Sequence, residues 1–337
     1  MSKTCVLLIN LGTPDSPSVK DVRKYLFEFL NDPRVIDIPA IARFMLVNFI
    51  IVPFRAPKSA KIYKELWTDK GSPILIYGQS LKEKLQNKLG ASYDVELAMR
   101  YQNPNLKVVC SRMEKKGYDK IIIVPLFPQY ASASTGSAID KAMKLISNWW
   151  VIPEIKIIAQ FYDDENYLNA VAAQSVKYNY EEYDHILFSY HGLPVKQVDK
   201  VYKDGKPCSD HKCEDEINDD NKYCYKAACY ATTRLLAVKL NLTKERYTVC
   251  FQSRLDKDWI EPFSDKIVVD LAKKGAKKLL VFSPAFVADC LETTVEIGIE
   301  YQKLFEENGG EKIQLVESLN DSPQWVDALH KIILKNL

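Results

Sequence analysis

The stretch that decides the fold runs from residue 93 to residue 127, where YDVELAM (93–99) is followed by LKVVCSRMEKK (106–116) and then by KIIIVPLF (120–127). The first and last runs have the length and apolar content of strands, whereas the middle run places apolar residues at helical spacing. Near-continuous apolar strands that alternate with helices are typical of parallel sheets covered on both faces. The stretch therefore predicts a β-α-β unit.

The same alternation extends along the whole chain and predicts an α/β fold. Further strands are expected at 5–11, 155–161, 185–190, 247–252, 278–283 and 312–317. Further helices are expected at 79–89, 137–147, 167–178, 225–240, 263–274 and 293–307. A last helix begins at Ser322-Pro323, a serine cap with proline at the first helical position. The eight strands divide into two groups of four, with a break near Tyr162.

Length and composition exclude several classes of protein. The 337 residues suggest two domains, and a hydrophobic content of 47% with only 12 glycines excludes disorder and collagen-like structure. Because 46 basic residues nearly balance 44 acidic ones, a dedicated nucleic-acid binder is disfavoured. Neither GxGxxG nor GxxxxGK[ST] occurs, so nucleotide-binding α/β proteins lose their main support.

The apolar runs indicate a cytoplasmic protein. The N-terminal run is too short for a signal peptide, and the longest apolar stretch, 36–54, is interrupted by Asp37, Arg43, Asn48 and two prolines. It therefore falls short of the roughly 20 clean residues of a membrane span. In a reducing cytoplasm, clustered cysteines are more often metal ligands than disulfides.

Ligands of open parallel sheets bind beyond the carboxyl ends of the strands. His191 lies at such a strand end, within FSYHGLP (188–194), where an imidazole can accept a proton near neutral pH. The alternative is a histidine that is merely hydrogen-bonded at the end of a strand. Position alone favours neither interpretation.

Three carboxylates follow the seventh strand. Glu292, Glu296 and Glu300 stack along one side of the helix expected there. A solvated acidic face is the more frequent explanation for such spacing. The other is a path for a divalent cation toward Glu292 and His191, and carboxylates suit a transiently held Fe²⁺ or Mg²⁺.

The most specific local signal is the spacing Cys208-x4-Cys213-x10-Cys224-x4-Cys229, in a polar segment at 204–230. Four thiolates from one segment can hold a [2Fe–2S] cluster or a structural Zn²⁺. The spacing matches no CxxC zinc ribbon, which favours iron–sulfur, and His211 is a candidate substitute ligand.

The segment 36–54 is the most apolar part of the chain, and Arg55, Lys58 and Tyr63 follow it. A helix here suits either a buried core or an apolar lip on a cleft. Two cations beside an apolar strip would hold a flat apolar ligand with carboxylate arms. Ordinary surface charges are the alternative.

Taken together, these segments resemble the ferrochelatases, which insert Fe²⁺ into a porphyrin during haem synthesis. The resemblance covers essentially the whole chain. Its markers are LLINLGTP (7–14), GSPI (71–74), MRY (99–101), PLFPQY (125–130) with TGS (135–137), FSYHGLP (188–194), FQSR (251–254) with Trp259, and SPAFVADCLET (283–293).

The resemblance implies a lyase with two similar Rossmann-like domains, 1–162 and 163–320, a porphyrin cleft between them, and a helix at 321–337 that returns to the first domain. His191 and Glu292 match the family's catalytic residues. Glu296 and Glu300 match an acidic ridge along a partly π-helical segment, which with His191 and Glu292 forms the path of the substrate iron. The matching porphyrin-binding positions are Leu11, Arg55, Lys58, Tyr63, Ser72, Arg100, Tyr130, Trp259 and Phe286.

Two further expectations follow from the resemblance. The chain is similar to a bacterial subgroup with an internal four-cysteine insert, so Cys208, Cys213, Cys224 and Cys229 become ligands of a [2Fe–2S] cluster by analogy. In some members of the family, the lip at 36–54 touches the membrane. The resemblance therefore implies that this chain makes peripheral contact with the inner face of a membrane. The expected reaction is insertion of Fe²⁺ into protoporphyrin IX. The alternatives are a chelatase for coproporphyrin or for another metal, and a non-catalytic tetrapyrrole-binding protein.

Overall fold

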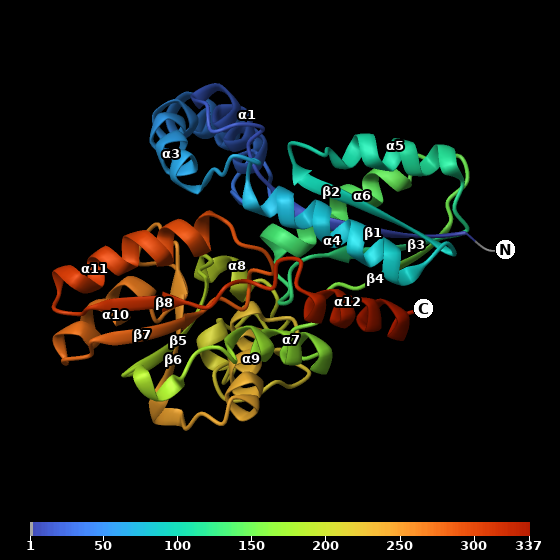
Figure 1. The fold of residues 1–337 in the computed structure, drawn as a ribbon. Helices are drawn as coiled ribbons and strands as arrows, with labels where there is room; N and C mark the ends of the chain where they lie inside the picture. The colour runs from blue at the N-terminus through green and yellow to red at the C-terminus, as the bar shows by residue number, and fades with distance from the viewer. Residues whose placement is uncertain (1–2) are drawn as a thin grey trace. The chain divides into compact units, whose positions relative to one another are not determined.

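The computed structural model describes residues 3–337 and divides into two compact units (Figure 1). Unit 1 contains the chain up to Phe127, then Ala131–Gln160 and Asn320–Leu337. Unit 2 contains Pro128–Tyr130 and Phe161–Leu319. Each unit is built around one parallel four-stranded sheet, which confirms the predicted α/β fold class.

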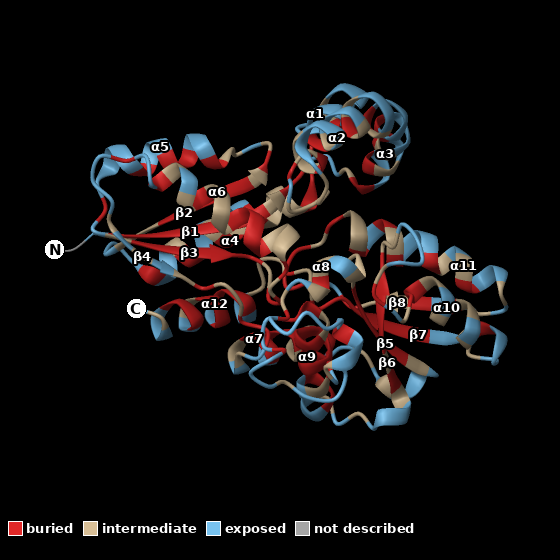
Figure 2. Cartoon of the chain, turned by 180° about the vertical axis from the view of Figure 1, so that it is seen from behind, coloured by how far each residue is buried: buried red, intermediate tan, exposed pale blue. Residues whose placement is uncertain are grey.

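The sheet of unit 1 has the strand order β2-β1-β3-β4. These strands are Tyr93–Tyr101, Thr4–Gly12, Lys120–Pro125 and Glu154–Ile157. Helices α5 (Leu106–Lys116) and α6 (Ser137–Ile146) pack against one face through Val109, Met113 and Ala142. Helix α4 (Pro73–Leu89) lies on the other face, beside α12 (Pro323–Lys335) (Figure 1). The central strands are buried on both sides, as their continuous apolar sequence requires (Figure 2).

The sheet of unit 2 repeats this topology, with the strand order β6-β5-β7-β8. These strands are Tyr247–Gln252, His185–His191, Lys278–Phe282 and Lys312–Leu315. One face packs against α10 (Ser264–Lys273), the π-helix η6 (Leu291–Tyr301) and α11 (Gln302–Glu307). Helices α7 (Glu165–Ser175) and α9 (Tyr225–Lys239) pack against each other. The short α8 (Val195–Asp199) precedes the cysteine-rich segment.

A helical run in unit 1 contains the apolar segment. It consists of α2 (Ala40–Met45), the π-helix η1 (Leu46–Ile51) and α3 (Val52–Leu66), and α3 packs against α1 (Val19–Leu30). The run from Ala40 to Leu66 is long and apolar enough to cross a membrane by length and composition, with a mean hydropathy of 1.4 over its most apolar window. The helix is longer than the predicted apolar segment 36–54, because it continues past Pro53 and Pro57 to Leu66. Only 17% of that window is buried.

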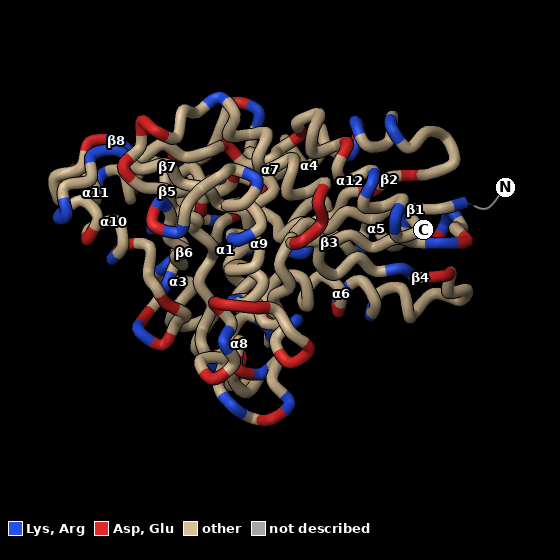
Figure 3. Tube along the Cα trace, turned by 90° about the horizontal axis from the view of Figure 1, so that it is seen from below, with Lys and Arg blue, Asp and Glu red and all other residues tan. Residues whose placement is uncertain are grey.

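The C-terminal helix α12 belongs to unit 1 and packs against α4. Ser322 caps it by accepting a hydrogen bond from the backbone N–H of Trp325, and Trp325 is fully buried. Asp321 accepts hydrogen bonds from Ser80 Oγ, at 2.5 Å, and from the ammonium group of Lys84. These contacts connect the last helix to the first half of the chain. Basic and acidic residues are interspersed along the trace of the chain, whose net charge is +2 (Figure 3).

Candidate active site and cysteine group

The carboxyl ends of β5 and β6 carry His191 and Gln252, which are paired in the register of the sheet. The next residue, Gly192, donates its backbone N–H to the backbone oxygen of Gln252 at 2.7 Å. A Cβ atom at Gly192 would lie 2.7 Å from that oxygen and 3.2 Å from Cε3 of Trp259. The strand end therefore accepts only glycine at position 192 without rearrangement.

His191 is half-buried at this strand end. Its Nδ1 atom lies 2.5 Å from the backbone oxygen of Gly192, and its ring lies 6.3 Å from that of Trp259 and 6.4 Å from that of Phe286. Because a carbonyl oxygen only accepts, Nδ1 carries the hydrogen and Nε2 retains its lone pair in the neutral ring. The imidazole is thus set up to accept a proton at Nε2.

The π-helix η6 carries the three predicted carboxylates. Glu292 and Glu296 are half-buried, whereas Glu300 is exposed. The Glu296 carboxylate accepts hydrogen bonds from Ser253 N (2.7 Å), Ser253 Oγ (2.5 Å), Gln252 Nε2 (3.0 Å) and Tyr301 Oη (2.9 Å). Glu296 therefore has a fixed orientation toward the end of β6.

The predicted iron-path residues do not form a compact ligand group. Within residues 3–337, His191, Glu292, Glu296 and Glu300 are absent from any set of three or more ligand atoms lying within 4.8 Å of one another. The only such set in that range consists of Cys208, Cys213 and Cys224.

The predicted porphyrin-binding residues of unit 1 differ in accessibility. Arg55 and Lys58 are exposed on α3, where their charges are available to carboxylates. Tyr63 is buried, with its ring 6.2 Å from that of Tyr25. Ser72 is also buried, and its hydroxyl oxygen accepts a hydrogen bond from Thr13 at 3.0 Å.

The remaining predicted positions are half-buried. They are Leu11 and Arg100 in unit 1 and Tyr130, Trp259 and Phe286 in unit 2. Arg100 forms an ion pair with Asp32 and donates to Ser137 Oγ at 2.7 Å. Its guanidinium is therefore already engaged within unit 1.

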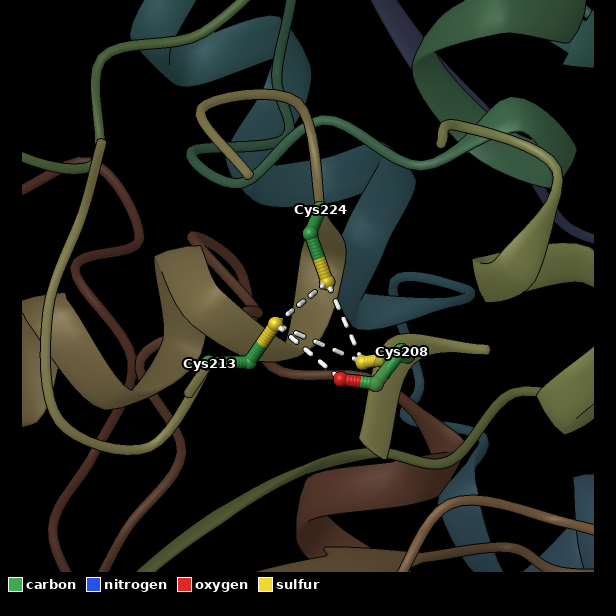
Figure 4. A group of neighbouring side chains, drawn as sticks. All are labelled: Cys208, Cys213 and Cys224. Carbon is green, nitrogen blue, oxygen red and sulfur yellow. Dashed lines mark hydrogen bonds between the residues drawn. The ribbon is translucent and has the colours of Figure 1, made fainter. Parts of the chain in front are cut away.

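Three of the four predicted cysteine ligands converge in unit 2 (Figure 4). Their sulfur atoms are separated by 3.5 Å (Cys208–Cys213), 3.6 Å (Cys208–Cys224) and 3.7 Å (Cys213–Cys224). Thiolates that bind one tetrahedral ion with bonds of about 2.3 Å lie roughly 3.8 Å apart. Hydrogen bonds among the three thiols lower the pKa of Cys224 and, together with burial, raise the pKa of Cys208 and Cys213. Of the three, only Cys224 therefore favours the thiolate form that a metal ligand needs.

Cys229 lies outside this group of three. It is fully buried on α9, and burial raises the pKa of its thiol well above the ordinary value. Tyr202 approaches the sulfur atoms instead. Its Oη atom lies 2.7 Å from Cys213 Sγ. His211 stacks on Tyr202 with a ring separation of 3.8 Å. Three of the four predicted cysteine ligands therefore lie together, and Cys229 is not among them.

Two buried polar residues near the site were not predicted as site residues. Gln252 is 1% exposed, and Asp32 is 6% exposed. A polar residue that ends an apolar strand was the available signal for Gln252, whereas no local pattern marks Asp32. Both take part in hydrogen-bond networks near predicted site residues.

The fold places the protein among the chelatase-like α/β proteins. It is similar to the sirohydrochlorin chelatase SirB from Bacillus subtilis subspecies spizizenii, solved in complex with cobalt, with a TM-score of 0.55 and 12% identity over 99% of this chain and 95% of that one. It is also similar to CbiX, the terminal enzyme of sirohaem biosynthesis in denitrifying bacteria, with a TM-score of 0.51 and 12% identity over 98% and 99% of the two chains. At such identities the similarity concerns the fold alone.

The sequence identifies the family. The ferrochelatase family model matches residues 3–337. The chain is 45% identical to the ferrochelatase of Legionella pneumophila (strain Paris) over 97% of its length and 98% of that protein. It is 42% identical to the ferrochelatase of Coxiella burnetii (strain CbuK_Q154) over 100% and 94% of the two chains. The chain belongs to the ferrochelatase family and is accordingly a metal chelatase of the lyase class.

Proposed function

We propose that the protein inserts Fe²⁺ into protoporphyrin IX, with His191 as the proton acceptor. The observation that carries this proposal is the contact between His191 Nδ1 and the Gly192 carbonyl, which leaves Nε2 as a base. Insertion replaces two pyrrole protons of the porphyrin by one Fe²⁺ ion and releases both protons. A base must therefore face the macrocycle.

The porphyrin must be distorted before the metal enters, because its two N–H groups lie in the ring plane. We propose that binding energy from the apolar and propionate contacts offsets the cost of saddling the ring. Nε2 of His191 then accepts a pyrrole proton, and Glu292 assists proton transfer or delivers the metal. Aromatic rings of Trp259 and Phe286 beside His191 support a flat aromatic substrate there.

The other site residues receive matching roles. Arg55 and Lys58 are assigned to the propionates because both cations are exposed, and Glu292, Glu296 and Glu300 are assigned to the approach of iron. Glu296 would act through its charge, since its oxygens already accept four hydrogen bonds. The remaining porphyrin contacts are assigned to Leu11, Tyr63, Ser72, Arg100 and Tyr130. Of these, Tyr63, Ser72 and Arg100 are buried or engaged and must move to reach a ligand.

Anaerobic incubation with protoporphyrin IX and Fe²⁺ tests the proposal. Loss of porphyrin fluorescence together with growth of the haem spectrum is expected. Coproporphyrin and other divalent metals serve as parallel substrates, and faster turnover of either would reassign the substrate. Porphyrin binding without insertion of any metal would instead support a non-catalytic tetrapyrrole-binding protein.

We propose further that the cysteine segment holds a [2Fe–2S] cluster with Cys208, Cys213, Cys224 and Cys229 as ligands. The convergence of three sulfurs supports a thiolate metal centre, and the resemblance supplies the cluster type and the fourth ligand. Such a cluster would need all four thiolates, so Cys229, which lies outside the group of three, would have to turn toward it. Such a cluster would supply a structural or redox-sensing centre.

Metal and sulfide analysis separates the cluster from a single ion. A [2Fe–2S] centre requires iron and acid-labile sulfide in equal amounts, and Cys208→Ser, Cys224→Ser and Cys229→Ser should each abolish its visible bands. Cys110→Ser, a buried thiol of unit 1, is the control. If the protein instead contains stoichiometric zinc and no sulfide, and Cys229→Ser retains that zinc, the site is a three-cysteine zinc site and not a cluster.

We also propose that the apolar lip makes peripheral contact with the cytoplasmic face of a membrane. Six large apolar side chains on the run from Ala40 to Leu66 are at least half exposed, and three cations accompany them. The apolar residues are Ile41, Phe44, Met45, Phe49, Ile50 and Phe54, and the cations are Arg43, Arg55 and Lys58. Apolar side chains flanked by cations are typical of segments that lie in a membrane interface.

A further inference from the structure

Gln252 is the residue through which the elements carrying His191 and Glu292 are joined. It ends β6, is 1% exposed, and pairs with His191 in the sheet. Its backbone oxygen accepts the N–H of Gly192 at 2.7 Å, which fixes the chain immediately after His191. The backbone of Gln252 therefore determines where the end of β5 lies.

The side-chain amide of Gln252 makes three more hydrogen bonds. Its Oε1 atom accepts from Ser189 Oγ at 2.8 Å, within the strand that ends at His191. Its Nε2 atom donates to the backbone oxygen of Glu292 at 2.7 Å and to Glu296 Oε2 at 3.0 Å. Both N–H groups and the carbonyl oxygen of the amide are thus used, so its orientation is fixed.

The bond to the Glu292 carbonyl matters because the carbonyl belongs to the first turn of η6. Glu296, one turn further along, is held to the same amide and to the backbone of Ser253. Two successive turns of the π-helix are therefore attached to β6, and through Ser189 to β5. A shift of η6 relative to His191 would break a buried hydrogen bond, which is costly.

From this network we infer that Gln252 is a positioning residue for metal insertion, because its buried amide sets the place of Glu292 relative to His191. The inference rests on the proposed roles of those two residues. Gln252 itself needs no contact with the porphyrin or the iron. A displacement of about 1 Å between reacting groups can reduce a rate about a hundredfold, so an error in this separation should appear in kcat.

Gln252→Leu removes the three side-chain hydrogen bonds, and Gln302→Leu is the matched control in the same unit. The amide of Gln302 also makes three hydrogen bonds, to Glu306, to the Glu311 carbonyl and from the Ile313 N–H. Both variants should lose thermal stability. Only Gln252→Leu should lower kcat, by about 10- to 100-fold, with the porphyrin Kd changed less than about threefold.

The split between kcat and porphyrin affinity is the readout that a purely structural role would not produce. Ser189→Ala removes only the anchor of Oε1 and should lower kcat less than Gln252→Leu, which keeps the test available if Gln252→Leu does not fold. An unchanged kcat in folded Gln252→Leu, or equal kcat losses in both glutamine variants, would overturn the inference.

The wild-type protein and His191→Ala separate this inference from the proposed function. If wild type inserts no metal, or if His191→Ala retains turnover, the proposed function fails first. If wild type is active, His191→Ala is inactive and Gln252→Leu behaves like wild type, only the positioning role of Gln252 fails.

Discussion

Arg100 donates a hydrogen bond from Nη2 to Asp32 Oδ2 at 2.5 Å, and the two side chains are only 12% and 3% exposed. The same carboxylate oxygen accepts from Ser137 Oγ at 2.5 Å and from Tyr101 Oη at 3.0 Å. Asp32 follows α1, whereas Arg100 lies in β2 and Ser137 begins α6. The pair therefore connects the segment between α1 and the lip at 36–54 to the sheet of unit 1.

Asp32→Asn should destabilise the protein by about 3–5 kcal/mol, because it leaves the Arg100 guanidinium buried without a counter-charge. Denaturant unfolding measures this effect. Asp327→Asn is the control, since Asp327 pairs with Lys88 at the surface and its side chain is 54% exposed. An exposed pair contributes about 0–1 kcal/mol. A comparably small loss for Asp32→Asn would mean that the buried pair is not important for stability.

The same carboxylate predicts how stability changes with pH. Burial acts to raise the pKa of Asp32, but hydrogen bonds from Ser137 and Arg34 N and the charge of Arg100 outweigh it and lower the pKa. A lowered pKa in the folded state stabilises the protein above the unfolded value of about 3.9. That contribution is lost as the pH falls through the folded pKa. The stability difference between wild type and Asp32→Asn should therefore shrink below about pH 4.

His191→Ala should abolish metal insertion while porphyrin affinity stays within about tenfold, since the variant removes a transition-state contact. His185→Gln is the control at the opposite end of the same strand, where His185 Nε2 lies 2.9 Å from Thr248 Oγ1. Fluorescence titration measures porphyrin binding, and haem absorbance measures turnover. Retained turnover in His191→Ala, or equal loss in His185→Gln, would remove His191 from the mechanism.

The sheets were predictable from sequence because their strands are buried on both faces. Val6, Leu8 and Ile122 are fully buried, so the runs that contain them are almost purely apolar. Helix α1 was missed, although the Ser18 cap and the spacing of Val22 and Leu26 mark an amphipathic helix. The charged residues on the outer face of this helix make residues 19–30 resemble a polar loop.

The candidate site was predictable only in part. His191 and the cysteine spacing are local signals, whereas the π-helical form of 291–301 was expected from the family resemblance alone. The pair of Asp32 with Arg100 joins residues 68 positions apart, and Gln252 with Glu292 joins residues 40 apart. Such contacts depend on how the strands are ordered in the sheet, which no local pattern contains.

Gly192→Ala should both destabilise the protein and reduce activity. The added Cβ would meet the Gln252 oxygen at 2.7 Å, and that oxygen belongs to the sheet and cannot yield cheaply. Overpacking of this kind costs about 1–3 kcal/mol. Gly298→Ala is the control for stability, because its Cβ would meet nothing closer than 3.8 Å. If thermal unfolding of the two variants is alike, the close approach at Gly192 is unimportant.

The lip predicts a measurable affinity for lipid. Phe49 and Phe54 are 62% and 73% exposed, and burying each ring in a bilayer interface should contribute up to about 1.5–3 kcal/mol. Replacing both by serine should therefore weaken binding to anionic vesicles, measured by flotation, by about tenfold or more if both rings reach the interface. Val176 and Val238 of unit 2, which are 80% and 81% exposed, provide the control pair as serine variants. Equal flotation of all three proteins would show that the exposed lip does not bind membranes, and its apolar side chains would then require another partner.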